Sequence, residues 1–303
     1  MSIAAPAPGI EHAAAPAVAA EARRPPGGLP AFRRHPRLYI GGALVLLLVA
    51  VAIFAPLLSP ADPIVGDISN SLQAPSPAHW LGTDDQGRDV LSRVLWGSRI
   101  SLSVAAISVS IGLLMGVSVG LTAGYAGGWV DLVLMRLIDA LLAFPGLLLA
   151  ISITAALGPQ IQNAMIAIGI VAIPVYARLT RAQVLSLRER EYVTAARAIG
   201  VSPVRIALRH MLPNIANPLI VQATLTTAFA ILQEAVLSFL GLGAQPPAPS
   251  WGEDINYNQR YLTNLMWWMS IGPGMAIFLA VFAFNFLGDA LRDWLDPQLR
   301  RRA

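Results

Sequence analysis

The chain has 303 residues, of which 55% are hydrophobic and 13% are charged, with a formal net charge of +4. Soluble proteins carry about 25% charged residues, so this composition excludes an ordinary soluble domain and favours a membrane protein. The sequence contains no cysteine, which excludes disulfides and thiolate chemistry. Its 21 basic residues are all arginine, which excludes a nucleotide-binding P-loop because that loop needs a lysine.

The histidines show no metal-binding pattern. They are scattered through polar segments, at His12, His35, His79 and His210. Helical metal ligands need to share one face, as two histidines four residues apart do. We therefore predict no metal site, no catalytic residue and no cofactor bound by this chain.

The first segment, residues 1–37, is rich in alanine and proline and ends in a basic cluster. It lacks apolar periodicity, so we predict a disordered tail. A cleaved signal sequence is a less favoured alternative, because the leader would be unusually long and no clear small-residue cleavage site follows.

Six apolar segments are long enough to cross a bilayer, whose hydrocarbon core of about 30 Å needs about 20 helical residues. They are approximately residues 38–58, 100–123, 130–157, 161–187, 215–243 and 264–288. The sequence thus predicts an all-α membrane protein with six transmembrane helices. Pro145 inside the third segment is expected to bend it.

Arginine is distributed unequally between the two sides of this arrangement. Five arginines lie in residues 1–37, seven in residues 178–214 and four in residues 289–303, whereas the opposite side has only Arg88, Arg93, Arg99 and Arg260. Basic residues favour cytoplasmic loops. We therefore expect cytoplasmic tails at both termini, 1–37 and 289–303.

The stretch "GTDDQGRDVLSRVLWG" precedes the second apolar segment. Asp85 or Asp89 can cap a helix that starts near residue 87, and Asp89 lies four residues before Arg93, a spacing that allows an ion pair. The apolar residues of this stretch are Val90, Leu91, Val94, Leu95 and Trp96. We predict an amphipathic helix at the outer interface or on neighbouring helices, so that residues 38–97 comprise the first span and this outer segment.

The stretch "EYVTAARAIGVSPVRIALRHMLPN", residues 191–214, has the pattern helix, turn, helix. Gly200 is a typical helix stop, and Ser202 with Pro203 a typical start. One interpretation is a DNA-reading element and another is a cytoplasmic docking element. A loop of roughly 27 residues tethered to the membrane at both ends cannot easily enter a groove of DNA, so we favour docking and predict no nucleic-acid partner.

This loop resembles the EAA segment of bacterial ABC importer permeases. Ala195, Ala196, Gly200, Leu212 and Pro213 stand at the positions that the family pattern requires. Thr194 stands where glutamate is commonest, so a salt bridge from that position to an ATPase is not expected.

Five flanking stretches extend the resemblance over about residues 38–300. They are "WLGTDDQGRDVLSRVLWGSRISL", "AFPGLLLAI", "LSFLGLG", "PSWGEDI" and "LGDALRDWLDPQLR". Together they resemble the C-type permease of dipeptide, oligopeptide and nickel importers. The resemblance implies type I ABC importer architecture, with a permease domain at residues 98–288 that contains a coupling loop at 191–212.

In that family the loop is a coupling helix seated in a groove of the ATPase subunit. The residues that the resemblance assigns to ATPase coupling are Tyr192, Thr194, Ala195, Ala196, Ile199, Gly200, Val201, Ser202 and Pro213. We expect the small side chains of Ala195 and Ala196 to allow close approach to the partner. Two short helices would meet at Gly200, and Pro213 would direct the chain into the fifth span.

Charged residues inside the predicted spans need partners or water, because each costs about 2.5 to 3.5 kcal/mol at the bilayer centre. Arg136 and Asp139 lie one helical turn apart and are expected to pair or to face the transport pathway. Glu234 has no basic neighbour within a turn. It is expected either to face the translocation cavity or to bond a partner subunit.

The resemblance implies a permease subunit in the bacterial inner membrane that forms part of a pathway for di- or oligopeptides. The implied partners are a second homologous permease, cytoplasmic subunits that bind ATP and Mg, an extracytoplasmic substrate-binding protein and membrane lipid. Nickel or another small solute is an alternative substrate. An ATP-independent channel or secondary transporter is less favoured, since the coupling loop would then have no purpose. An intramembrane enzyme is also less favoured, since no His or Cys lies in any predicted span.

Overall fold

The computed structural model describes residues 36–295, and within that range it is helical without a named strand. The long helices are α1 (Pro36–Leu58), α2 (Val90–Ala126), α3 (Gly128–Leu142), α4 (Gly146–Leu157), α5 (Ile161–Arg188), α8 (Leu212–Phe239) and α10 (Trp268–Leu295). The short ones are η2 (Ile68–Asn70), α6 (Glu191–Ala198), α7 (Pro203–Arg205), the π-helix η3 (Ile206–Met211), α9 (Trp251–Asn258) and η4 (Gln259–Asn264).

Five helical stretches are long and apolar enough to cross a membrane, and α3 with α4 forms a sixth candidate. This confirms the all-α, multi-span prediction. The predicted disordered tail falls outside the described residues, except that residues 36 and 37 open α1. At the other end α10 continues to Leu295, past the predicted end of the permease domain at residue 288, and a cytoplasmic location of residues 289–303 stays a prediction.

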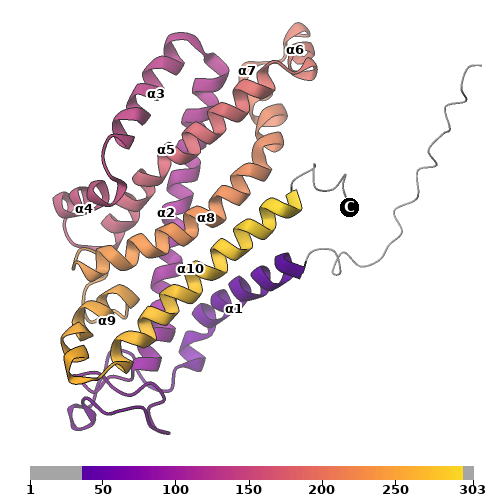
Figure 1. Cartoon of the computed structure of the whole chain (residues 1–303). Helices are drawn as coiled ribbons and strands as arrows, with labels where there is room; N and C mark the ends of the chain where they lie inside the picture. The colour runs from indigo at the N-terminus through magenta and orange to yellow at the C-terminus, as the bar shows by residue number, and fades with distance from the viewer. Residues whose placement is uncertain (1–35, 296–303) are drawn as a thin grey trace, which may run out of the picture. The chain divides into compact units, whose positions relative to one another are not determined.

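The third predicted span is bent by 88° between α3 and α4. The break falls at Pro145, which has no N–H to donate and disfavours helical backbone at the residue before it. The expected bend is confirmed, and it is sharp enough to divide the span into two helices (Figure 1).

The predicted amphipathic helix near residues 89–97 is not a separate element. α2 begins at Val90 and runs unbroken to Ala126, so this stretch is the first turns of the second span. Asp89 caps the helix by accepting a bond from the backbone N–H of Ser92, as the sequence suggested. Gly97 could have broken the helix, but it lies inside α2 without interrupting it. The outer turns and the apolar turns therefore form one helix.

A glycine every fourth residue lets α2 pack closely on α5. A Cβ at Gly116 would lie 2.6 Å from the carbonyl oxygen of Ile173, and one at Gly120 would lie 2.5 Å from that of Ala177. Real Cβ atoms do not approach so closely, so only glycine permits this backbone separation. The α2–α5 pair is thereby fixed as the central unit against which α8 packs.

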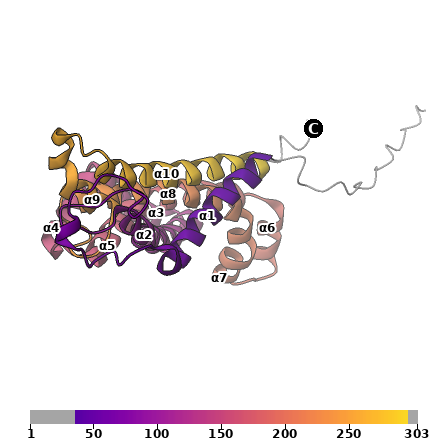
Figure 2. The same cartoon turned by 90° about the horizontal axis from the view of Figure 1, so that it is seen from below.

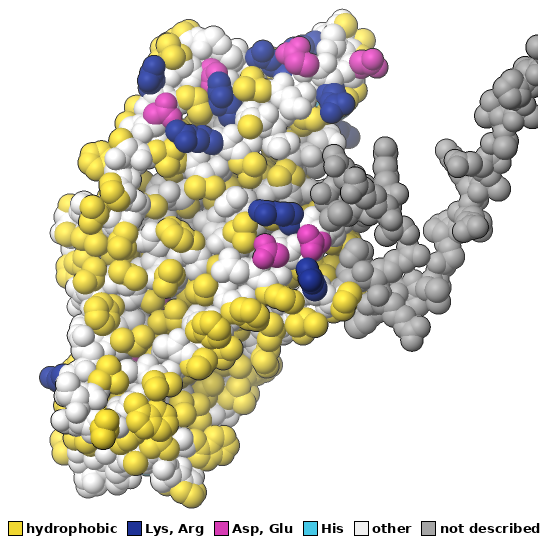
Figure 3. All heavy atoms as spheres, viewed as in Figure 1, with side chains coloured by type: hydrophobic (Ala, Val, Ile, Leu, Met, Phe, Trp, Pro, Cys, Tyr) yellow, Lys and Arg dark blue, Asp and Glu magenta, His cyan; other side chains and the backbone are white. Residues whose placement is uncertain are grey.

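Short helices lie at the two ends of this bundle. Figures 1 and 2 place α6 and α7 at one end and α9, with the α1–α2 connection, at the other. On the face shown in Figure 3, charged side chains gather at the end that carries α3 and α6 and near the end of α10, whereas the middle is mostly hydrophobic. This distribution is what a membrane-spanning bundle requires.

Candidate functional site

α6 ends in a left-handed glycine that turns the chain. Gly200 has a φ of +78°, which glycine adopts without steric cost. Its N–H donates to the carbonyl of Arg197, and the N–H of Val201 donates to that of Ala196, each over 3.0 Å. This Schellman pair satisfies the last carbonyls of α6. The predicted stop at Gly200 is confirmed, and residues 191–205, here called the elbow, form a defined turn.

The elbow has one buried face and one exposed apolar face. Val193 is fully buried and Ala196 is 7% exposed, and both belong to the core cluster. Ile199 is 81% exposed and Val204 is 68% exposed. The prediction that Ala196 faces a partner is wrong, because positions three apart on α6 lie against the chain's own bundle.

The other predicted coupling residues lie mostly at the surface. Tyr192, Thr194, Ala195, Gly200, Ser202 and Pro213 are exposed, whereas Val201 is partly buried. The exposed apolar surface also includes Val204 and Leu208, neither of which the sequence interpretation singled out. Their signal was available, since the two residues are four apart on one helix face.

The second of the two short helices expected to meet at Gly200 is continuous with α8. Helical backbone runs from Pro203 through the π-turns of η3 into α8, as one stretch of 37 residues. Pro213 was expected to direct the chain into the fifth span. It lies instead in the first turn of α8, directly after η3, inside the continuous helical stretch. A proline removes a backbone donor and crowds the preceding turn, and the wider π-helix before it accommodates both effects.

Ion pairs tie α3 to α5 at the arginine-rich end. Arg181 contacts both carboxylate oxygens of Asp131, at 2.5 and 2.6 Å, and Arg178 contacts Asp139 at 2.6 Å. Asp139 therefore pairs with Arg178 of α5 and not, as predicted, with Arg136 of its own helix. Arg136 itself is exposed.

Glu234 on α8 is completely buried within the chain. Its carboxyl group accepts bonds from the hydroxyls of Ser101 and Ser238 at 2.8 Å and of Ser250 at 3.0 Å. Neither expected position, in a cavity or against a partner subunit, describes this residue. The serines come from α2, α8 and the residue before α9, so Glu234 joins these elements.

A second polar cluster lies at the α9 end, centred on the buried Arg93. Its guanidinium contacts Asp254, Glu253 at 3.2 Å, and the carbonyls of Pro63 at 2.9 Å and Pro247 at 3.4 Å. Arg93 therefore holds α9 and two loops onto α2. We call this group of five residues the Arg93 cluster.

The Arg93 cluster contains two carboxyl groups for one arginine. Burial, and then the negative charge of Asp254, raise the pKa of Glu253 to about 7, although Arg93 opposes the shift. The predicted i, i+4 pair of Asp89 with Arg93 does not form. Asp89 instead contacts His79 at 3.0 Å. Partners some 160 residues away in sequence displaced the local one.

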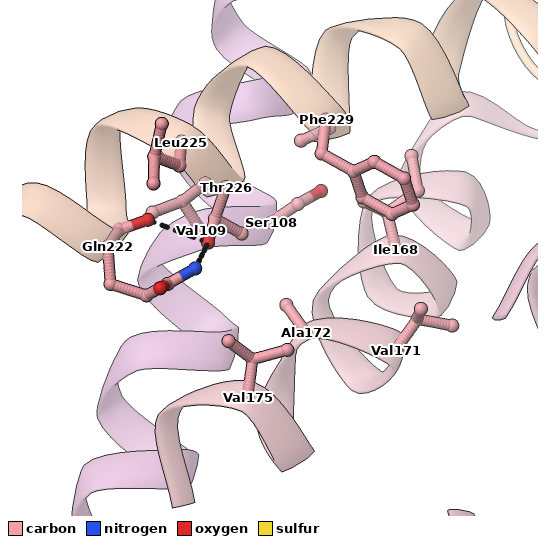
Figure 4. A pocket seen from close by; sticks show the side chains of 11 residues that line it. Ser108, Val109, Ile168, Val171, Ala172, Val175, Gln222, Leu225, Thr226 and Phe229 are labelled. Carbon is pink, nitrogen blue, oxygen red and sulfur yellow. Dashed lines mark hydrogen bonds between the residues drawn. The ribbon is translucent and has the colours of Figure 1, made fainter. Parts of the chain in front are cut away.

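A cavity of 270 Å³ lies between α2, α5 and α8 (Figure 4). Its polar lining residues are Ser108, Gln222 and Thr226, and the remaining lining is apolar. Gln222 donates to the hydroxyl of Thr226 at 3.2 Å, as Figure 4 shows. The sequence interpretation missed these residues, although Gln222 and Thr226 stand four apart on one face of an apolar helix.

The sequence matches two family models. Residues 116–301 match the binding-protein-dependent transport system inner membrane component, and residues 29–75 match the N-terminal TM domain of oligopeptide transport permease C.

Curated relatives resemble the chain over most of its length. A dipeptide transport system permease protein of Alkalihalophilus pseudofirmus is 47% identical over 261 residues, which is 86% of each chain. A di/tripeptide transport system permease protein of Pseudomonas aeruginosa is 45% identical and covers 89% of this chain and 91% of its own. A glutathione transport system permease protein of Pectobacterium atrosepticum is 43% identical, covering 89% and 90%.

A solved structure shares the fold. A chain of the MetNI methionine ABC transporter, in an inward-facing conformation, superimposes with a TM-score of 0.51 at 20% identity, covering 66% of this chain and 97% of that one. Together with the family match over more than half of the sequence, this likeness identifies a type I importer permease fold. The chain belongs to the family of binding-protein-dependent transport system inner membrane components and is a permease subunit of an ABC importer.

Proposed function

We propose that this permease transports short peptides, and that its elbow couples the pathway to a cytoplasmic ATP-binding subunit. The names of the relatives, which include dipeptide, di/tripeptide and glutathione transport, support the substrate class. The partner subunits would bind ATP and Mg. A second homologous permease would complete the pathway, and an extracytoplasmic binding protein would deliver the peptide at the α9 end.

The exposed apolar face of the elbow carries the coupling proposal. Ile199 and Val204 project large apolar side chains at the end where basic residues gather. Basic loops favour the cytoplasmic side, so these side chains would stand in water unless a cytoplasmic protein covered them. An apolar patch with a charged rim is typical of a protein interface.

The continuous helix from Pro203 to Phe239 connects the elbow to the cavity. The same helix carries Val204 at its start and Gln222 and Thr226 in its middle. Val193 and Ala196 meanwhile anchor α6 in the core. When ATP binding moves the partner subunits, displacement of the elbow would therefore move the α8 wall of the cavity relative to α2 and α5.

Uptake by the reconstituted transporter tests the substrate class. The complex, with its ATP-binding subunits and binding protein, is placed in proteoliposomes that contain ATP. We expect uptake of a labelled dipeptide to depend on ATP and to be reduced by excess unlabelled dipeptide. Uptake that dipeptide does not reduce, or that proceeds without ATP, would contradict the proposal.

A matched pair of variants tests the elbow. Ile199→Glu places a charge in the proposed contact. Leu265→Glu places a charge at the residue after η4, which is equally exposed at 81%. We expect Ile199→Glu to weaken binding of the ATP-binding subunit at least tenfold and Leu265→Glu to leave it unchanged. Equal binding by both variants would show that the elbow is not the contact.

The orientation is tested by labelling from outside. Gln86 is exposed at the α9 end, so a tag inserted there should react with a reagent that does not cross the membrane, and tags at the two termini should not. Reaction at the termini but not at Gln86 would invert the proposed orientation.

A further inference from the structure

Arg99 differs from the three other arginines at the α9 end. Arg88, Arg93 and Arg260 each contact a carboxylate oxygen at 3.2 Å or less. Arg99 is exposed, and within residues 36–295 its guanidinium carbon lies over the ring of Trp96, 5.1 Å from the ring centroid. Its positive charge is therefore not neutralised by a carboxylate of the described chain.

A groove of 510 Å³ opens beside Arg99. α1 forms one wall with Val49 and Ile53, α2 forms the other with Leu102 and Ala106, and residues of α8 and α10 form the floor. Two hydroxyls also line it, and both donate to backbone carbonyls of their own helix, at 2.8 Å for Ser103 and 2.7 Å for Thr227. The groove is thus largely apolar, and the charge of Arg99 beside it is not neutralised by a described carboxylate.

Arg99 lies at the α9 end of the membrane-spanning part of α2. The apolar stretch 100–123 begins at the next residue, and Arg93 with its buried partners precedes it. An arginine at this boundary extends toward the headgroups and binds an anion there, and Trp96, almost one turn earlier, is a residue type enriched at that level.

We propose that the groove binds a phospholipid, with an acyl chain between α1 and α2 and the phosphate on Arg99. A guanidinium can donate two parallel hydrogen bonds to a phosphate, which matches the unpaired charge. The apolar walls match a hydrocarbon chain. Bound lipid would fill the gap beside α1, a helix of which only 17% of the most apolar window is buried within the chain.

Photolabelling of the complete transporter in nanodiscs tests this site. The probe is phosphatidylglycerol with a diazirine on one acyl chain, in a background of phosphatidylethanolamine, and the adducts are mapped by peptide mass spectrometry. We expect adducts in the α1 and α2 walls of the groove. Arg99→Gln should lower this labelling at least fivefold, and the same chain carried on diacylglycerol, which lacks the phosphate, should label at least fivefold less.

A second pair of variants guards against a folding defect in Arg99→Gln. Ala106→Trp fills the groove at an exposed position and should abolish the labelling, whereas Leu114→Trp, exposed on α2 outside the groove, should leave it unchanged. Equal labelling in Arg99→Gln, or cross-links from the groove to the second permease instead of lipid, would overturn the proposal. The labelling needs neither ATP nor peptide, so its outcome is independent of the proposed transport function.

Discussion

The two ends of the bundle are stabilised in opposite ways. At the α9 end, Arg93 and Asp254 are buried, and their partners come from four segments of the same chain. At the α6 end, the elbow places Ile199 and Val204 in solvent, and its fixed geometry comes from two backbone bonds at Gly200.

This difference separates a region that the chain completes alone from one that it leaves incomplete. Buried charges need every partner in place, so the Arg93 cluster has little freedom to change. Exposed apolar side chains gain when another surface covers them. The α9 end is therefore suited to hold helices in register, and the α6 end to receive a second subunit.

The largest expected effect comes from breaking the Arg93 cluster. Arg93→Met leaves two buried carboxyl groups without their cation, which costs about 3 to 5 kcal/mol. The matched change Arg260→Met removes an ion pair with Asp85 at 3.1 Å in which the arginine is 56% exposed, and such pairs contribute about 1 kcal/mol or less.

Thermal unfolding of the purified transporter in detergent measures both variants. We expect a large fall in Tm for Arg93→Met and a small one for Arg260→Met. Equal falls would show that the α9 end does not depend on its buried charges.

A smaller effect is expected from titration of Glu253. Its pKa in the folded chain is about 7, against 4.5 for an ordinary glutamate. The folded state therefore binds the proton more tightly than the unfolded state, so this contribution to stability is complete below pH 4.5 and is lost as pH rises to about 7.

The Glu253 variant isolates this titration from other groups. Glu253→Gln keeps a neutral side chain of the same shape beside Arg93, Asp254 and the nearby Arg88. We expect the wild-type Tm to fall between pH 5 and pH 8 by more than that of the variant. Parallel pH profiles would exclude Glu253 as the titrating group.

Sequence reasoning succeeded for features that local chemistry determines and failed for contacts between distant segments. The six apolar segments, the bend at Pro145 and the stop at Gly200 follow from local chemistry, and all three are present. The partners of Arg93 lie about 160 residues away. Spacing along a helix suggested only the nearby Asp89, because long-range contacts leave no local pattern.

The elbow shows a second reason for error. In the α6 sequence "EYVTAARA" the polar residues Glu191, Thr194 and Arg197 recur every third residue, so periodicity favoured the opposite face as the buried one. The family resemblance was followed instead, and it assigned Ala196 to the partner. The structure places Val193 and Ala196 inward. The surroundings of Glu234 were missed for another reason. The serines that bond it come from three segments and have no charge that would reveal a pairing.

A local effect, smaller than that of breaking the Arg93 cluster, is expected at Gly200. A Cβ there would meet nothing within 4 Å, so Gly200→Val costs only the left-handed backbone strain of about 1 to 2 kcal/mol. Gly200→Asn should cost less, because asparagine tolerates this conformation. Hydrogen exchange at the amide of Val201 should accelerate roughly 5- to 30-fold in the valine variant, and equal acceleration in both variants would contradict this account.

Cysteine protection at the elbow tests most directly whether the α6 end is completed by another subunit. The chain has no cysteine, so Ile199→Cys, Val193→Cys and Leu265→Cys each give a single labelling site. In permeabilised membranes without the ATP-binding subunits, maleimide should label positions 199 and 265 but not the buried position 193. With those subunits present, labelling at 199 should fall at least tenfold while labelling at 265 stays unchanged. Undiminished labelling at 199 in the assembled, ATP-hydrolysing transporter would contradict the account.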